Sequence, residues 1–176
     1  MINVSIYFVR HGQDEEGFRG GWSQRGLIEE GVQQSKKLGE YLKQNDKDYR
    51  IDRIISSDLK RALETAKYVG DSLQLPVEQS KDWRETNKGV LAGMPDDEAD
   101  RKYPGLYFNS LGMNERYPGG ESPSENFTRI HKAFRDLCKE QIDKKHLENV
   151  LVVTHGGVIN IIYHILNKIE WTNKNK

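Results

Sequence analysis

The feature that most limits the possible folds is a sequence pattern that occurs three times: a short apolar run, then a polar turn, then a helical segment. Residues 4–12 read VSIYFVRHG, residues 51–58 read IDRIISSD, and residues 150–157 read VLVVTHGG. Near-continuous apolar runs are typical of strands in a parallel sheet that is covered on both faces. The sequence therefore predicts an α/β fold, a three-layer α/β/α sandwich with a mostly parallel central sheet.

Apolar residues at helical spacing predict the helices around this sheet. We expect them at about residues 27–44, 59–73, 96–102, 127–142 and 158–166. The run Leu75-Pro76-Val77 predicts a short strand, and Pro76 places it at an edge of the sheet. The polar tail, residues 170–176, is expected to be frayed.

The length of 176 residues fits a single domain, residues 1–176. Residues 86–125 lack a clear period apart from the short helix, and glycines and prolines alternate there with aromatic residues. A long irregular segment inside a compact domain is often a lid or a binding loop. The following side chains either form an apolar wall over a site or pack elsewhere: Trp22, Met94, Tyr103, Tyr107 and Phe108.

Composition limits the partners of the chain. The 27 Lys and Arg residues equal the 27 Asp and Glu residues, without the basic excess of a nucleic-acid-binding protein. A single cysteine, Cys138, excludes an intrachain disulfide framework and suits a reducing cytoplasm. No run approaches the ~18 apolar residues of a membrane span, and the N-terminus does not resemble a signal peptide. We expect a cytoplasmic protein without nucleic-acid or membrane partners, and the oligomeric state stays open.

If the three apolar runs are neighbouring parallel strands, their polar turns meet at one edge of the sheet. That edge would hold Arg10, His11, Arg61 and His155, together with at least one helix N-terminus. Helix N-termini favour anions, and the planar fork of arginine matches phosphate oxygens. The expected ligand is a phosphate group.

An imidazole is the best candidate for a nucleophile in such a site. No cysteine lies near the turns, and neither Ser56 nor Ser57 has an evident base beside it. Carboxylates do not cluster as a magnesium site needs, and no residues have the spacing of a zinc site, so we expect no metal and no cofactor. Cationic surroundings lower the pKa of a histidine and keep it ready for in-line attack on phosphorus. A carboxylic acid must then protonate the leaving oxygen.

These motifs together resemble the histidine phosphatase superfamily, in its phosphoglycerate-mutase-like branch. The resemblance rests on Arg10-His11-Gly12, Arg61 in SSDLKRALETA, Glu85 in WRETNKGVLAG, His155 in THGG and the PGGES run at 118–122. It implies a phosphoglycerate-mutase-like fold, with His11 as the nucleophile that becomes phosphohistidine. It also implies that Arg10, Arg61 and His155 hold the phosphoryl oxygens. Glu85 would donate a proton to the leaving group and later activate water.

The sequence departs from the family pattern directly after the first motif. Gln13 and Asp14 stand where the family often has Glu or Ser followed by Thr or Ser, and Gly17 or Phe18 replaces an Asn that contacts phosphate. Gln13 could donate to phosphate instead. Most members also have a further strand after the last helix, which we expect to be absent or displaced because this chain stops at Lys176.

Three functions compete. The first is a metal-independent phosphatase that hydrolyses a small phosphate monoester through His11, with Glu85 as general acid and base. The second is a phosphoglycerate-type mutase, and the third is a non-catalytic module that binds a phospho-ligand or a protein. The chain lacks the long insertions of the mutases it resembles, which favours hydrolysis, and the complete residue set argues against a binding module. The remaining histidines are expected on helix surfaces or in packing: His131, His146 and His164.

Overall fold

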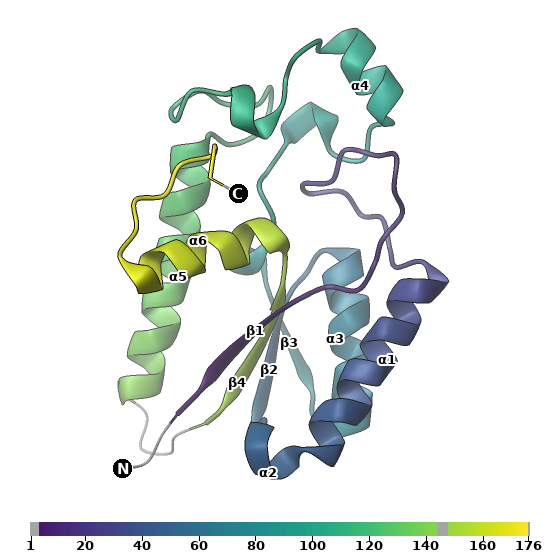
Figure 1. Cartoon of the computed structure of the whole chain (residues 1–176), viewed down its shortest axis with the longest axis vertical. Helices are drawn as coiled ribbons and strands as arrows, with labels where there is room; N and C mark the ends of the chain where they lie inside the picture. The colour runs from purple at the N-terminus through teal and green to yellow at the C-terminus, as the bar shows by residue number, and fades with distance from the viewer. Residues whose placement is uncertain (1–3, 144–147, 176) are drawn as a thin grey trace.

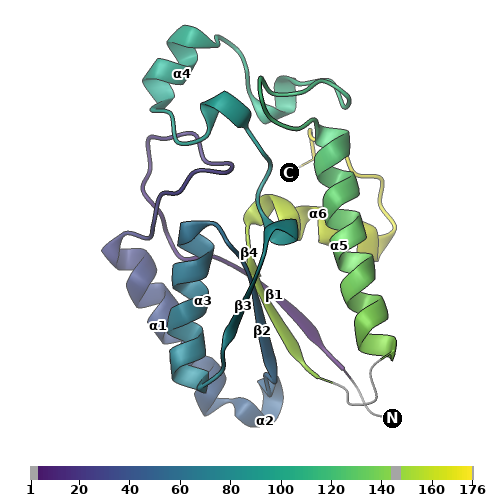
Figure 2. The ribbon, with the colours of Figure 1, turned by 180° about the vertical axis from the view of Figure 1, so that it is seen from behind.

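The computed structural model describes residues 4–143 and 148–175 and shows a parallel sheet between two pairs of helices (Figure 1). The strands are β1 (Ile6–Arg10), β2 (Arg53–Ser57), β3 (Val77–Ser80) and β4 (Val150–Thr154). Their order is β1-β4-β2-β3, and every pairing is parallel. Helices α1 (Glu29–Gln44) and α3 (Lys60–Leu73) cover one face, and α5 (Pro123–Asp143) and α6 (Gly156–Asn167) cover the other (Figure 2). The predicted three-layer fold is confirmed.

The predicted elements are present with small shifts at their ends. Helix α1 begins at Glu29, two residues after the expected start, and β3 begins at Val77 rather than at Leu75. The β3 strand is an edge strand, as Pro76 predicts. The shorter elements are α2 (Asp46–Tyr49), η1 (Lys81–Trp83), η2 (Gly89–Leu91), α4 (Asp96–Lys102) and η3 (Phe108–Ser110). Among the described residues, no helix is both long and apolar enough to cross a membrane.

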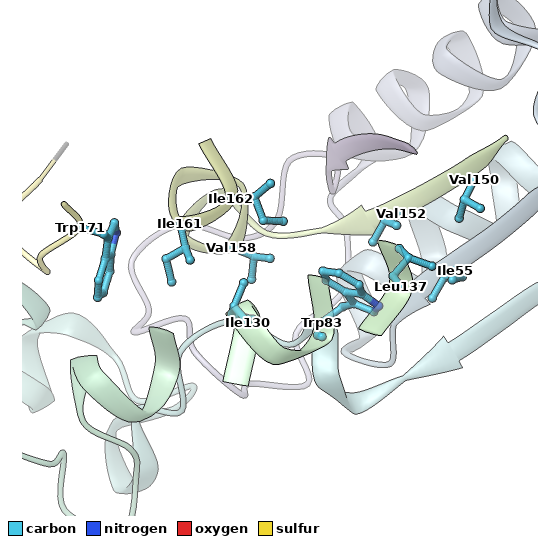
Figure 3. Close-up of a cluster of buried hydrophobic side chains, with 11 residues drawn as sticks. Ile55, Trp83, Ile130, Leu137, Val150, Val152, Val158, Ile161, Ile162 and Trp171 are labelled. Carbon is cyan, nitrogen blue, oxygen red and sulfur yellow. The ribbon is translucent and has the colours of Figure 1, made fainter. Parts of the chain in front are cut away.

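The central strand β4 supplies side chains to the hydrophobic core on both faces of the sheet. Val150 and Val152 pack in the cluster under α5 and α6 (Figure 3), whereas Leu151 and Val153 pack in the cluster under α1 and α3. Each of these aliphatic side chains is at most 1% exposed, and such burial contributes about 1.5–3 kcal/mol per side chain. The two clusters hold β4 in place and thereby fix the point at which its polar turn emerges.

Residues 86–125 lie above the carboxyl ends of the strands (Figure 1). The segment has the expected short helix α4 and in addition η2 and η3, and it has a hydrophobic cluster of its own, made by Leu91, Ala99, Leu111 and Tyr117. Its irregular pattern in the sequence follows from this small core, since short turns bury apolar side chains without a regular period.

The tail after α6 is packed, so the expectation of a frayed end is wrong for the residues that the structure describes. Trp171 is buried, and its indole Nε1 donates to Oδ1 of Asn160 at 2.9 Å. The buried Asn173 donates to the carbonyl oxygens of Phe108 and Leu111. The ring of Trp171 and the amide of Asn173 therefore hold the polar tail against α6 and residues 86–125. Within the described residues the tail adds no strand, and β1 is an edge of the sheet.

Candidate active site

A cavity of about 840 Å³ opens at the carboxyl ends of β1 and β4. Arg10 and His11 reach it from the end of β1, Arg61 from the first turn of α3, and Gly157 from the first turn of α6. Glu85 contributes from the loop after η1. The three polar turns therefore meet at one edge of the sheet. Four of the residues singled out in the sequence line the same cavity, namely Arg10, His11, Arg61 and Glu85.

Strand register brings the two histidines together. Arg10 of β1 lies opposite Thr154 of β4, so His11 and His155 follow neighbouring strands, and their ring centroids are 5.2 Å apart. The backbone N–H of His11 donates to the carbonyl of Thr154 at 3.0 Å. Gly12 then passes so close to the carbonyl of Gly31 in α1 that a Cβ atom would overlap with it. Only glycine lets the chain turn here and keep His11 at the cavity.

The hydrogen bonds of His11 fix which ring nitrogen carries the lone pair. Nδ1 lies 2.7 Å from the carbonyl oxygen of Gly12. A carbonyl only accepts hydrogen bonds, so Nδ1 carries the proton in the neutral ring. Nε2 is consequently unprotonated, and its lone pair accepts a hydrogen bond from Nε of Arg61 at 3.2 Å. Burial, together with the positive charges of Arg61 and Arg10, lowers the pKa of His11, which favours this neutral form.

His155 is fully buried behind His11 and is not part of the cavity wall. Its Nε2 lies 2.8 Å from Oγ of Ser57, and its Nδ1 has no hydrogen-bond partner among the described residues. The expectation that Ser57 has no base beside it is therefore wrong. Ser57 is itself buried and, like His155, lies outside the cavity wall. Burial, with the charge of Arg61, lowers the pKa of His155 well below its usual value.

Arg61 is 2% exposed and connects the cavity to the loop after β1. Its Nη1 and Nη2 donate to the carbonyl oxygens of Ser23 and Gly21. A carboxylate also faces it, since Oδ2 of Asp14 lies 3.5 Å from Nε of Arg61 and Oδ1 lies 4.0 Å from Nδ1 of His11. The sequence showed Asp14 only as a departure from the family pattern, and the structure places this negative charge inside the anion site.

Glu85 is held through both its side chain and its backbone. Its Oε1 accepts the N–H of Thr86 at 3.0 Å, and its Oε2 accepts the N–H of Gly157 at 3.3 Å. Its backbone carbonyl accepts from Nε1 of Trp22 at 2.7 Å and from Nη2 of Arg129 at 3.2 Å. The carboxyl group is thus fixed at the cavity wall by groups from three distant parts of the chain.

Arg129 of α5 organises the segment that carries Glu85. Its Nη1 donates to the carbonyls of Asp82 and Arg84, and its Nε and Nη2 donate to the carboxylate of Glu121 in the PGGES run. A guanidinium offers five donors in a rigid fork, which suits this set of acceptors. Arg129 was not assigned to the site from the sequence, and Trp22 was considered only for an apolar wall, because helical and aromatic patterns do not reveal such distant hydrogen-bond partners.

The other residues considered in the sequence take varied positions. Gln13 lines the cavity, and its side-chain amide has no hydrogen-bond partner among the described residues. Of the side chains considered for an apolar wall, only Phe108 lines the cavity. His131 is exposed on α5, and His164 is buried on α6 with Nδ1 bonded to a carbonyl, whereas His146 lies outside the described residues. Across residues 4–143 and 148–175, no three His, Cys, Asp or Glu side chains gather as a metal site requires.

Comparisons with known proteins show what the chain is similar to. A family model described as the histidine phosphatase superfamily (branch 1) matches residues 6–176. The metal-independent phosphoserine phosphatase of Arabidopsis thaliana is 36% identical over 91% of this chain and 67% of its own length. Mycobacterial glucosyl-3-phosphoglycerate phosphatase matches with a TM-score of 0.76 and 26% identity over 96% of this chain and 80% of its own. Phosphoglycerate mutase from Bacillus anthracis str. Sterne matches with a TM-score of 0.74 and 30% identity over 94% and 80%. The expected phosphoglycerate-mutase-like fold is thereby confirmed.

Proposed function

This chain belongs to the histidine phosphatase superfamily, and we propose that it is a metal-independent phosphatase that hydrolyses a small phosphate monoester through a phosphohistidine on His11. The observation that carries the proposal is the unprotonated Nε2 of His11, at the wall of a cavity that also holds Arg10, Arg61 and Glu85. A neutral imidazole nucleophile, cations and a carboxyl group are the parts that phosphoryl transfer needs.

In the first step Nε2 of His11 attacks the phosphorus in line with the leaving oxygen. The new N–P bond forms as the ester P–O bond breaks, and Glu85 in its carboxylic acid form donates its proton to the leaving oxygen. The alcohol departs, and the phosphoryl group stays on His11. The hydrogen bond from Nδ1 to Gly12 stabilises the positive charge that the ring gains.

In the second step water attacks the phosphorus of the phosphohistidine. Glu85, now a carboxylate, accepts a proton from the water, the N–P bond breaks, and inorganic phosphate is released. The same residue acts as acid and then as base, so its fixed position beside Gly157 serves both steps.

The phosphoryl oxygens are held by Arg10, Arg61 and His155, with Gln13 as a further donor. Arg61 gives up its hydrogen bond to His11 and donates to an oxygen instead. The unpartnered Nδ1 of His155 supports its role, because a buried polar atom without a partner costs free energy until a ligand satisfies it. The free amide of Gln13 at the cavity wall supports a contact with phosphate.

The names of the relatives support a small substrate, since phosphoserine and glucosyl-3-phosphoglycerate are both phosphate monoesters of small molecules. A phosphoglycerate-type mutase is the second candidate, favoured by the likeness to the mutase of Bacillus anthracis. The two reactions share the first step and differ in whether water or a substrate hydroxyl accepts the phosphoryl group.

The decisive experiment offers p-nitrophenyl phosphate to the purified protein in EDTA and compares it with His11→Ala and His131→Ala. We expect EDTA-resistant hydrolysis in the wild type and in His131→Ala, whose exposed side chain lies outside the cavity, and none in His11→Ala. A radiolabelled substrate should leave an acid-labile phosphoenzyme only where His11 is present.

Inhibition by EDTA, or full activity in His11→Ala, would contradict the phosphohistidine mechanism. Interconversion of 3- and 2-phosphoglycerate without release of phosphate, followed by NMR, would favour the mutase. Phosphate binding without any phosphoryl transfer would favour a binding module.

A further inference from the structure

Lys88 is a cavity residue that the reaction described above does not use. It follows Glu85 by three residues and lines the same cavity in a half-buried position. Its position is well fixed, because its carbonyl accepts the N–H of Leu91 at 3.1 Å and its Cβ and Cγ pack against Gly21. Gly21 has a φ of +68°, and a side chain there would collide with the stem of Lys88.

The ammonium group of Lys88 has no ion-pair partner among the described residues. Arg19, a second cation near this part of the cavity, is already paired with Asp96 and Asp100 and stacks on Tyr107. A half-buried ammonium without a counter-ion has lost hydration that nothing in the protein replaces. Burial accordingly lowers the pKa of Lys88. An anion that enters the cavity would restore the missing interaction.

Lys88 lies apart from the charges that surround the nucleophile. Its most influential charged neighbours are Glu85, Arg19, Arg61 and Asp96. Those of His11 are instead Arg61, Asp14 and Arg10. Lys88 lines the cavity on the same loop as Glu85, and its stem lies beside the carbonyl of Thr86 against Gly21, so Lys88 lies on the Glu85 side of the cavity. Because Glu85 protonates the leaving oxygen in the proposed reaction, this is the side on which the leaving group must lie.

The acidic residues on the loop after His11 form no ion pair with Lys88. Those residues are Asp14, Glu15 and Glu16. The acids that attract Lys88 are instead Glu85 and Asp96, and neither forms an ion pair with its ammonium group. Glu15 is moreover paired with Arg25 at 2.7 Å.

We propose that Lys88 binds a second anionic group, a carboxylate or a phosphate, on the leaving group of the substrate. The inference rests on the proposed phosphatase function and sharpens it, since the preferred substrates become monoesters with an anion at each end. Arg10, Arg61 and His155 hold the phosphoryl group that is transferred, and Lys88 holds the anion that departs with the alcohol. Lys88 is thus a residue that determines specificity.

Matched substrate pairs test this inference. The carboxylate pair is 3-phosphoglycerate and glycerol 3-phosphate, and the phosphate pair is 1,3-propanediol bisphosphate and 3-hydroxypropyl phosphate. We expect kcat/KM of the wild type to be about 10- to 100-fold higher for the doubly anionic member of at least one pair, the range for a hydrogen bond between charged groups. The pair that shows the preference identifies the second anion.

Three variants locate the cause of the preference. In Lys88→Met the ratio within the pair should fall towards one, whereas Lys88→Arg should keep most of it because the positive charge remains. Lys67→Met, an exposed lysine on α3 outside the cavity, should keep the wild-type ratio. An unchanged ratio in Lys88→Met, or equal losses for both members of a pair in both Lys88 variants, would overturn the proposal.

A binding measurement separates this inference from the proposed function. Phosphonates are not hydrolysed, so calorimetry with 4-phosphonobutyrate and butylphosphonate reports binding even if the protein turns over no monoester. Tighter binding of 4-phosphonobutyrate that Lys88→Met abolishes supports the anion site in either case. Equal affinity for the two phosphonates, combined with no preference within the substrate pairs, rejects it while leaving hydrolysis by His11 untouched.

Discussion

Gly157 lies against the carboxyl group of Glu85 so closely that a Cβ atom on Gly157 would overlap with Oε1. The N–H of Gly157 donates to Oε2 of the same group at 3.3 Å. The adjacent Gly156 is different, because a Cβ atom there would meet only the side chain of Arg10 at 3.8 Å, an ordinary contact. Two neighbouring glycines in the first turn of α6 thus have unequal roles.

We expect Gly157→Ala to displace Glu85 and to lower kcat/KM for an alkyl phosphate by about 100-fold, the cost of misplacing a catalytic group by roughly 1 Å. Gly156→Ala should keep most of the activity, since the methyl group has room. Steady-state kinetics of the two variants, with thermal unfolding as a check on folding, gives the comparison. Similar activities in both variants would show that Glu85 tolerates the methyl group or takes no part in the reaction.

Arg129 fixes the backbone of Glu85 and should act on catalysis only through that residue. Because an alkyl leaving group needs a proton and 2,4-dinitrophenolate does not, Arg129→Met should lower hydrolysis of an alkyl phosphate by about 10- to 100-fold and that of 2,4-dinitrophenyl phosphate far less. Arg135→Met, an exposed arginine on the same helix, serves as the control. Equal losses on both substrates would mean that Arg129 supports the fold and does not position the acid.

The sequence was sufficient to predict the strand ends and the side chains that they carry, because each motif directly follows a buried strand. His11, Arg61 and His155 therefore needed only the assumption of a parallel sheet. Arg129 could not be found in this way, since 44 residues separate it from Glu85 and their contact depends on how α5 packs.

The polar tail is a second case in which the sequence pattern does not reveal tertiary contacts. Its composition predicts fraying, yet Trp171 and Asn173 find partners in residues 86–125 and on α6. Hydropathy averages over neighbours in the sequence, so it does not reveal one ring and one amide that are buried by distant residues. For the same reason the pairing of Ser57 with His155, 98 residues apart, was not foreseen.

Burial of His11 and His155 should make the protein sensitive to moderate acid. Both pKa values are lowered in the folded state, so the unfolded chain, whose histidines titrate near 6.5, binds more protons below that pH. The stabilising contribution of the neutral histidines should be fully present above about pH 6.5, and the free energy of unfolding should fall as the pH drops below that value, by at most about 2 kcal/mol per histidine at pH 5. Urea unfolding at pH 7.5 and pH 5 measures this loss.

His155→Gln should lose less stability than the wild type between these two pH values, while the exposed His131→Gln should behave as the wild type does. Asp58 does not interfere, because its ion pair with Arg84 lowers its pKa from an ordinary value that is already near 3.8. A pH dependence in His155→Gln equal to that of the wild type would show that His155 is not held neutral in the folded protein.

Asp14 places a negative charge where the phosphoryl group is expected to bind. Its carboxylate lies 3.5 Å from Arg61, and like charges about 4 Å apart repel by about 4 kcal/mol at an effective dielectric constant of 20. The side chain is 26% exposed, and water reduces this repulsion, so we expect Asp14→Asn to bind inorganic phosphate about tenfold more tightly. Calorimetric titration measures the change, and Glu16→Gln, an exposed acid at the same cavity, should change the affinity less. Weaker binding in Asp14→Asn would show instead that Asp14 holds Arg61 in the orientation that phosphate requires.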